Sequence, residues 1–160
     1  MLKIKIIAVG KLKETYWQAA LAEYQKRLGR YCQFFILEVD DLPEPKHMGE
    51  KQKETLLWQE GERILKQIKP GSCVIPLCIE GKQLSSEEFA ELFTRLENQG
   101  ISEVDFIIGG SNGLSEEVKR KAFTKLSFSK MTFPHQIARV LLCEQIYRAF
   151  KIKNGETYHK

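Results

Sequence analysis

Two stretches of the chain carry residue types that could do chemistry. The first, FIIGGSNGLSEEV (106–118), places Gly109, Gly110 and Gly113 between an apolar run and the start of a helix. The second, LSFSKMTFPHQIARVLLCEQIYRAF (126–150), leads through small hydroxyl residues to a helix that carries His135 and Arg139 on one face. A glycine turn suggests a ligand held against backbone. A histidine beside an arginine suggests proton transfer near an anion.

The spacing of the three glycines excludes the two familiar phosphate loops. The pattern is GGxxG rather than GxGxxG, and no Gly-Lys-Ser/Thr follows it. Glu116 and Glu117 also place negative charge in the first helical turn, where the helix dipole would otherwise attract an anion. A ligand that lacks phosphate or carries positive charge remains compatible. On spacing alone, a merely structural corner explains the glycines equally well.

His135 is a candidate general base because it falls in the first turn of its helix. The positive end of the helix dipole there lowers the pKa of the imidazole and favours the neutral form, which can accept a proton. The plainer interpretation, a helix-start histidine bonded to a local group, stays open at this point.

These stretches must be positioned by an α/β fold. Apolar runs predict strands at 2–9, 34–39, 73–79, 104–108 and, more weakly, 126–131. Helical periodicity predicts helices over 16–28 and 57–68, one opened by a Ser85–Glu88 capping box, and one from Pro134 to about Phe150. Strands that alternate with helices indicate a mostly parallel sheet with helices on both faces. We expect a single domain over 1–160 and a mobile surface loop at 40–53.

Composition narrows the class of protein. No apolar run reaches the length of a signal peptide or a membrane span, so we expect a cytoplasmic protein without a membrane partner. The four cysteines form no CxxC pair, which makes a metal site and disulfides unexpected. Residues 119–160 hold ten Lys or Arg and two Glu, a net +8, whereas residues 1–118 carry −4. This asymmetry suggests contact with a polyanion, and a solvated lysine-rich surface is the alternative.

The chain resembles the ribosomal RNA large-subunit methyltransferase H family of the SPOUT superfamily. The resemblance rests on AVGKLKE near the N-terminus, IGGSNGL at 108–114, LSFSKMTFPHQIARVLLCEQIYRAFKI from 126, and the final YHK, and it covers essentially the whole chain. It implies an α/β knot, with a deep C-terminal trefoil knot. Chain physics alone predicts an unknotted open sheet instead, because knots are rare.

The resemblance also implies an activity and its partners. A homodimer would transfer methyl from S-adenosylmethionine to N3 of a pseudouridine in a 23S rRNA hairpin loop of the assembled ribosome. Carried over by position, the cofactor site comprises Leu77, Gly109, Phe128, Ser129, Lys130, Met131, Thr132 and Phe133. The glycines would let backbone approach the cofactor, and Pro76 would mark an irregular strand position beside it.

The catalytic roles are hypotheses of our own. A neutral His135 would take the N3 proton, and Arg139 would stabilise charge on the ring carbonyls. Tyr158 and His159 are candidates to act from the tail, which in a dimer could serve the partner's site. Two alternatives remain: a non-catalytic protein that binds RNA or the ribosome, and a flavodoxin-like mononucleotide binder, which Glu116 and Glu117 disfavour.

Overall fold

The computed structural model describes all residues, 1–160. Strands and helices alternate along most of the chain. In order they are β1 (Lys3–Val9), α1 (Thr15–Leu28), β2 (Gln33–Val39), α2 (Glu50–Leu65), β3 (Cys73–Gln83), α3 (Ser86–Asn98), β4 (Glu103–Ile108), α4 (Glu116–Arg120), β5 (Leu126–Ser127) and α5 (His135–Lys153).

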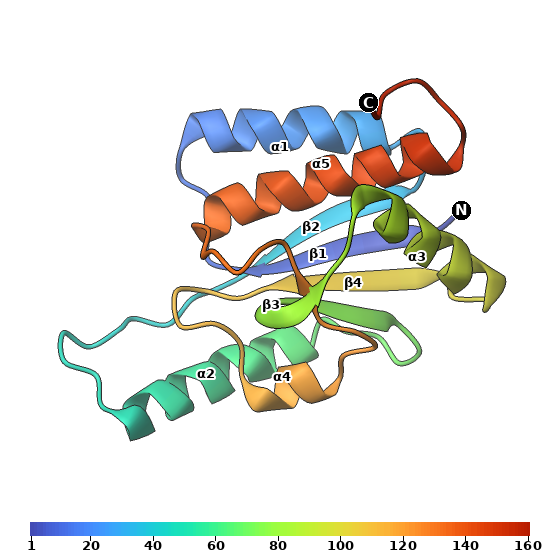
Figure 1. Cartoon of the computed structure of the whole chain (residues 1–160). Helices are drawn as coiled ribbons and strands as arrows, with labels where there is room; N and C mark the ends of the chain where they lie inside the picture. The colour runs from blue at the N-terminus through green and yellow to red at the C-terminus, as the bar shows by residue number, and fades with distance from the viewer.

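The sheet has five strands in the order β2-β1-β4-β3-β5, and every strand pair is parallel. Helices α1, α3 and α5 cover one face, and α2 and α4 cover the other (Figure 1). The predicted α/β fold with a parallel sheet and helices on both faces is confirmed. Parallel strands all end at the same edge of a sheet, so this topology brings the ends of β3 and β4 together.

Burial explains why the central strands read as nearly continuous apolar runs. Strand β1 lies between two neighbours and is covered on both faces, and six of its seven residues are buried. Pro76 marks the place where β3 leaves β4, since the pairing ends at Pro76–Ile107 and β3 meets β5 only from Leu77 onward. The predicted irregular strand position is confirmed.

Several boundaries differ from the sequence prediction: β3 continues to Gln83 instead of ending at 79, α2 ends at Leu65 instead of 68, and two further differences have visible causes or consequences. Strand β5 covers only two residues of the predicted run 126–131, because serine side chains divert the backbone after it. Ser127 Oγ donates to the carbonyl of Ser129, and the amide of Met131 donates to Ser129 Oγ. Helix α2 begins at Glu50, so the loop after β2 is shorter than predicted.

The chain crosses itself closely where β3 runs on beside β5. A Cβ added at Gly81 would lie 2.7 Å from the carbonyl carbon of Leu126 and 2.9 Å from that of Lys125. Only glycine allows two backbones to touch in this way. Beyond this crossing, the chain passes from α4 on one face to α5 on the other (Figure 1). The trefoil knot itself stays a prediction from the resemblance.

None of the helices combines the length and the apolar character that a membrane-spanning segment needs.

Candidate functional site

The main cavity lies at the C-terminal ends of β3 and β4. Its volume is about 360 Å³, within the range of small-molecule sites. Three segments line it: Leu77–Glu80 at the end of β3, the glycine turn after β4, and the stretch from β5 into α5. This is where parallel α/β sheets bind ligands, because loops from several strands converge there.

The glycine turn is shaped by its own backbone. A Cβ on Gly109 would lie 2.8 Å from the carbonyl carbon of Gly113 and closer still to the oxygen. Gly110 and Gly113 form an isolated bridge, and Gly113 has a φ of +83°, which favours glycine. The glycine at 109 is therefore required first by the turn itself. The predicted role of Gly109, to make room for a cofactor, stays a prediction.

The turn passes directly into α4, whose start is capped by a side chain. Ser115 Oγ accepts a hydrogen bond from the amide of Val118, and Glu116 and Glu117 occupy the first turn, as predicted. Sequence reasoning missed Ser115, although a serine directly before two glutamates is a common helix start. Both carboxylates line the groove between α2 and α4 and not the cavity, so the structure does not direct their charge at a ligand there.

The stretch from β5 to α5 contributes both apolar and hydroxyl side chains to the cavity. Most of the predicted cofactor residues line the cavity, namely Leu77, Gly109, Phe128, Ser129, Met131, Thr132 and Phe133. Lys130 is exposed and does not line the cavity, so the structure does not bring it to the site. Met131 is 73% exposed and Phe133 is 38% exposed. Two large apolar side chains thus stand at the rim.

His135 lines the same cavity and is the first residue of α5. Its Nδ1 is buried and has no hydrogen-bond partner, which argues against the plainer interpretation of a locally bonded histidine. Burial lowers the pKa of His135, and the charge of Arg139 lowers it further. The lowered pKa agrees with the predicted direction, with burial as the largest cause and Arg139 next, whereas Asp41 and Glu14 oppose it. The ring is neutral near pH 7 and can accept a proton.

Arg139 does not face the cavity, which corrects its predicted role. Its side chain is 1% exposed and donates to Glu38 Oε2 at 2.6 Å. The other terminal nitrogen donates to the carbonyls of Gly10 at 2.8 Å and Val9 at 3.2 Å. Arg139 therefore ties α5 to the ends of β1 and β2. It positions the helix that carries His135, and its positive charge lowers the pKa of that imidazole.

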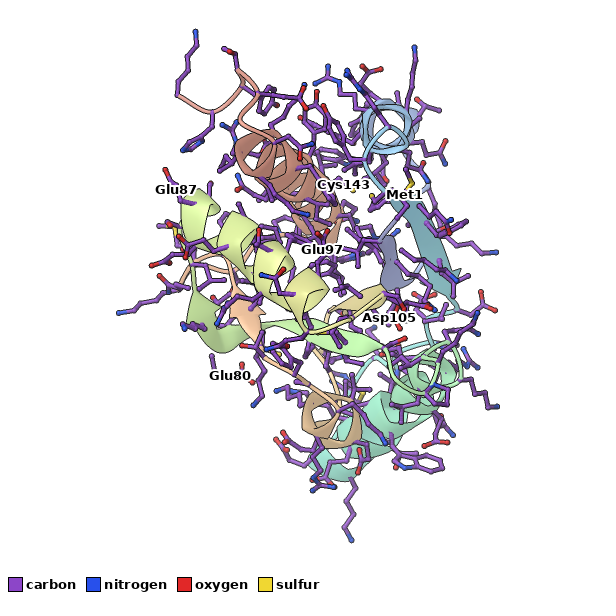
Figure 2. The ribbon with its side chains drawn as sticks, turned by 90° about the vertical axis from the view of Figure 1, so that its right-hand side faces the viewer. Met1, Glu80, Glu87, Glu97, Asp105 and Cys143 are labelled. Carbon is purple, nitrogen blue, oxygen red and sulfur yellow. The ribbon has the colours of Figure 1, made fainter.

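The tail residues lie away from the cavity of their own chain. His159 Nε2 lies 2.7 Å from Glu87 Oε1, and its Nδ1 lies 3.1 Å from Arg148. Tyr158 donates to Glu144 Oε1 at 3.3 Å, and its pKa is raised by burial and by that carboxylate. Figure 2 shows Glu87 on the outside of the molecule at the start of α3. The structure therefore brings neither Tyr158 nor His159 to His135 within one chain.

Two polar contacts at the cavity escaped the sequence prediction. Lys119 Nζ lies 2.8 Å from Glu80 Oε1, which lowers the pKa of Glu80 and raises that of Lys119. Both line the cavity. On the other side of the turn, Glu44 accepts hydrogen bonds from Ser111 Oγ and Asn112 Nδ2. Each contact joins residues far apart in the chain, so no local pattern could have revealed it.

Cys78 also lines the cavity but is no candidate nucleophile. Burial raises the pKa of its thiol, and Glu80 raises it further. A thiol with a raised pKa stays protonated and unreactive. Of the side chains at the cavity, His135 remains the one suited to proton transfer.

Comparison with known proteins agrees with this geometry. The family model described as "Predicted SPOUT methyltransferase" matches residues 2–159. Among solved structures, the chain is similar to a probable methylase family protein from Haemophilus influenzae Rd KW20, with a TM-score of 0.54 and 19% sequence identity. That match covers 100% of this chain and 72% of the other. At this identity the structural match shows a shared fold.

Proposed function

The chain belongs to the SPOUT methyltransferase family, and on this basis we propose that it methylates ribosomal RNA with S-adenosylmethionine as donor. The proposed acceptor is N3 of a pseudouridine in a hairpin loop of 23S rRNA, within the assembled ribosome in the cytoplasm. The family supports methyl transfer. The acceptor follows from the motif resemblance.

The observation that carries the proposal is the chemistry of the cavity walls. Leu77, Met131 and Phe133 offer apolar contact to adenine, and Ser129 and Thr132 offer hydroxyl groups. The turn lacks the spacing of both phosphate loops, and the one lysine that lines the cavity, Lys119, is ion-paired with Glu80 and so offers no free cation to a phosphate. The residues present therefore fit S-adenosylmethionine.

When bound, S-adenosylmethionine supplies an electrophilic methyl group for direct displacement. The chain's own task is to align the ring nitrogen, exclude water and remove the N3 proton. His135 is placed for the last step, since its buried Nδ1 lacks a partner and its lowered pKa keeps it neutral. Arg139 holds α5, and hence His135, against the ends of β1 and β2.

The proposed working unit is a homodimer. Met131 and Phe133 expose apolar surface at the cavity rim, where a second subunit could cover it. Tyr158 and His159 would then act, if at all, on the cavity of the partner chain.

Two experiments test the proposal. Calorimetry with S-adenosylmethionine should give saturable binding, and a folded protein that gives no heat would favour the non-catalytic RNA-binding alternative. Nucleoside mass spectrometry of large-subunit RNA should show loss of methylated pseudouridine in cells that lack the protein. An unchanged level would overturn the assigned acceptor.

The role of His135 has its own test. A His135→Gln variant should lose about 10²- to 10⁴-fold in kcat while its affinity for S-adenosylmethionine is kept. Because the pKa of His135 is lowered from 6.5, the wild-type kcat/KM should fall on the acid side with its midpoint below pH 6.5. The variant should lack this acid limb, and an unchanged limb would assign the base to another group.

A further inference from the structure

Carboxylates from outside residues 119–160 neutralise part of the positive charge of the C-terminal part, and three such pairs reduce its net charge from +8 to +5. Five of its ten cations form ion pairs with carboxylates. The pairs are Lys119–Glu80, Arg139–Glu38, Arg148–Glu144, Lys151–Glu156 and Lys153–Glu97, and only Arg148–Glu144 joins residues one helical turn apart. The net +8 of residues 119–160 therefore overstates what a polyanion would meet. The unpaired cations are the ones free to contact a polyanion.

Four unpaired lysines lie on or near the outer edge of β3. Lys121, Lys125 and Lys130 form no ion pair, and neither does Lys82 near the end of β3. The backbone joins them: the amide of Lys82 donates to the carbonyl of Lys125 at 2.8 Å, and the amide of Phe123 donates to Val74 at 2.8 Å. Residues 121–126 thus run alongside β3, which brings the backbones of Lys121, Lys125 and Lys82 to one edge of the sheet.

Two exposed apolar side chains lie on the same edge. Phe123 and Ile79 are each 54% exposed. Phe123 falls between Lys121 and Lys125 along the chain, so the sequence flanks an aromatic residue with a cation on each side. We call Lys82, Lys121, Lys125, Lys130, Phe123 and Ile79 the basic edge. It borders the cavity, because Ile79 and Leu126 line that cavity.

The neighbouring surface has the opposite charge. A groove between α2 and α4 is lined by Glu50, Glu54, Glu116 and Glu117, with Arg120 and Lys53 beside them. A polyanion would be repelled from the acidic side of this groove. The boundary between the two surfaces runs along α4, from acidic residues at its start to basic residues at its end.

We propose that the basic edge binds a single-stranded RNA segment next to the nucleotide that enters the cavity. The lysines would contact phosphates, and Phe123 would stack on a base, which is how proteins hold single strands without reading their sequence. A ring between cations favours RNA over an acidic polypeptide, which offers no bases to stack. The inference rests on the proposed function, because it names where the substrate lies.

The test measures binding of a fluorescently labelled, uridine-rich single-stranded RNA over a range of salt concentrations. Lys121→Gln/Lys125→Gln should lower the slope of log affinity against log salt by about 1.4, the value for two phosphate contacts on a single strand. Lys26→Gln on α1, combined with Arg30→Gln just after that helix, removes the same charge from two exposed cations elsewhere and should leave the slope unchanged.

The stacking contact is tested separately. Phe123→Ala should weaken RNA binding about tenfold, and Phe123→Trp should restore it. Phe123 is half exposed and holds its place through a backbone bond, so the fold should tolerate both changes.

Several outcomes would overturn the basic edge: equal slopes for the two double variants, an unaffected Phe123→Ala, or a wild-type protein that does not bind the RNA. Variants that lose binding to purified ribosomes but not to the RNA would assign the edge to a ribosomal protein instead. Calorimetry with S-adenosylmethionine should be unchanged in every variant. Absence of that binding in the wild type would count against the proposed function and not against the basic edge.

Discussion

The two faces of the sheet are built differently. Under α1, α3 and α5 the core contains 25 buried residues, whereas under α2 and α4 it contains nine, so most of the apolar burial lies on the first face. The first face is also rich in aromatic contacts. Phe93 packs against Phe89, Phe106 and Phe150, with ring centroids 5.1 to 6.2 Å apart.

The second face contains buried charge. Asp105 is fully buried with Lys5 Nζ 3.6 Å away, and burial raises its pKa. Figure 2 shows Asp105 in the interior, between the helix layers. Glu60 on α2 is 5% exposed and accepts a hydrogen bond from the amide of Leu42. A smaller core with buried charge provides less stabilisation, because ions lose solvation on burial.

This difference predicts that the first face is the more stable part of the fold and that the second face opens more easily. The glycine turn leads into α4, and Glu44 links the loop after β2 to that turn, so two segments at the cavity belong to the second face. Local opening should start there and leave α3 and α5 closed. The first face would then hold His135 in place while the second adjusts to a ligand. Four experiments test this comparison.

The largest effect is expected from truncation in the larger core. Leu142→Ala and Ile64→Ala remove similar side chains that are 0% and 1% exposed, on the first and second face respectively. Such changes cost about 2–5 kcal/mol, and we expect Leu142→Ala near the upper end and Ile64→Ala near the lower. Urea unfolding followed by circular dichroism measures both. Equal losses would contradict the difference between the faces.

The next effect concerns the glycine turn. Gly109→Ala should cost about 1–3 kcal/mol of stability, because its Cβ cannot be accommodated against the carbonyl of Gly113. Cofactor affinity should also fall at least tenfold. Gly110→Ala is the matched control, since its Cβ would come no closer than 3.4 Å to Val9. Similar thermal and calorimetric results for both variants would show that the turn can relax.

A smaller effect is expected where α2 meets α4. A Cβ at Gly61 would lie against Ser115 Oγ and 3.3 Å from Ser115 Cβ, so Gly61→Ala should displace the residue that caps α4. We expect a loss of about 1 kcal/mol, the usual value of a cap. In a double-mutant cycle with Ser115→Ala, the double variant should lose less than the sum of the single variants. Strict additivity would mean that the two sites do not interact.

The smallest effect is expected from removal of a buried charge. Burial raises the pKa of Glu60 above 4.5, and Asp41 and Glu44 add to the rise, while the Leu42 amide and Arg63 oppose it. Wild-type stability should therefore decrease as pH rises through that pKa. Glu60→Gln keeps an acceptor for Leu42 and should match the wild type below pH 4.5 and exceed it above, by less than about 1 kcal/mol. A variant less stable than the wild type at pH 7 would show that the ionised carboxylate is needed.

The sequence by itself determined the elements and the place of the cavity. Apolar runs predicted all five strands, and the Ser85–Glu88 capping box is present with both bonds. The glycine turn, the two glutamates in the first turn of α4 and a neutral His135 also followed from local patterns. These features depend on neighbours within a few residues, which is the range over which periodicity and capping act.

Only the tertiary structure decided which charged side chains form ion pairs and which distant residues are in contact. Arg139 is bound to Glu38, 101 residues away, and His159 lies against Glu87, 72 residues away. Gly109 is required because the carbonyl of Gly113 folds back onto it. Three of the five ion pairs in the C-terminal part also join distant segments, and the lysines of the basic edge take part in none of them. Such contacts depend on how the sheet and helices pack, and a side chain's sequence neighbours do not specify its partner across the fold.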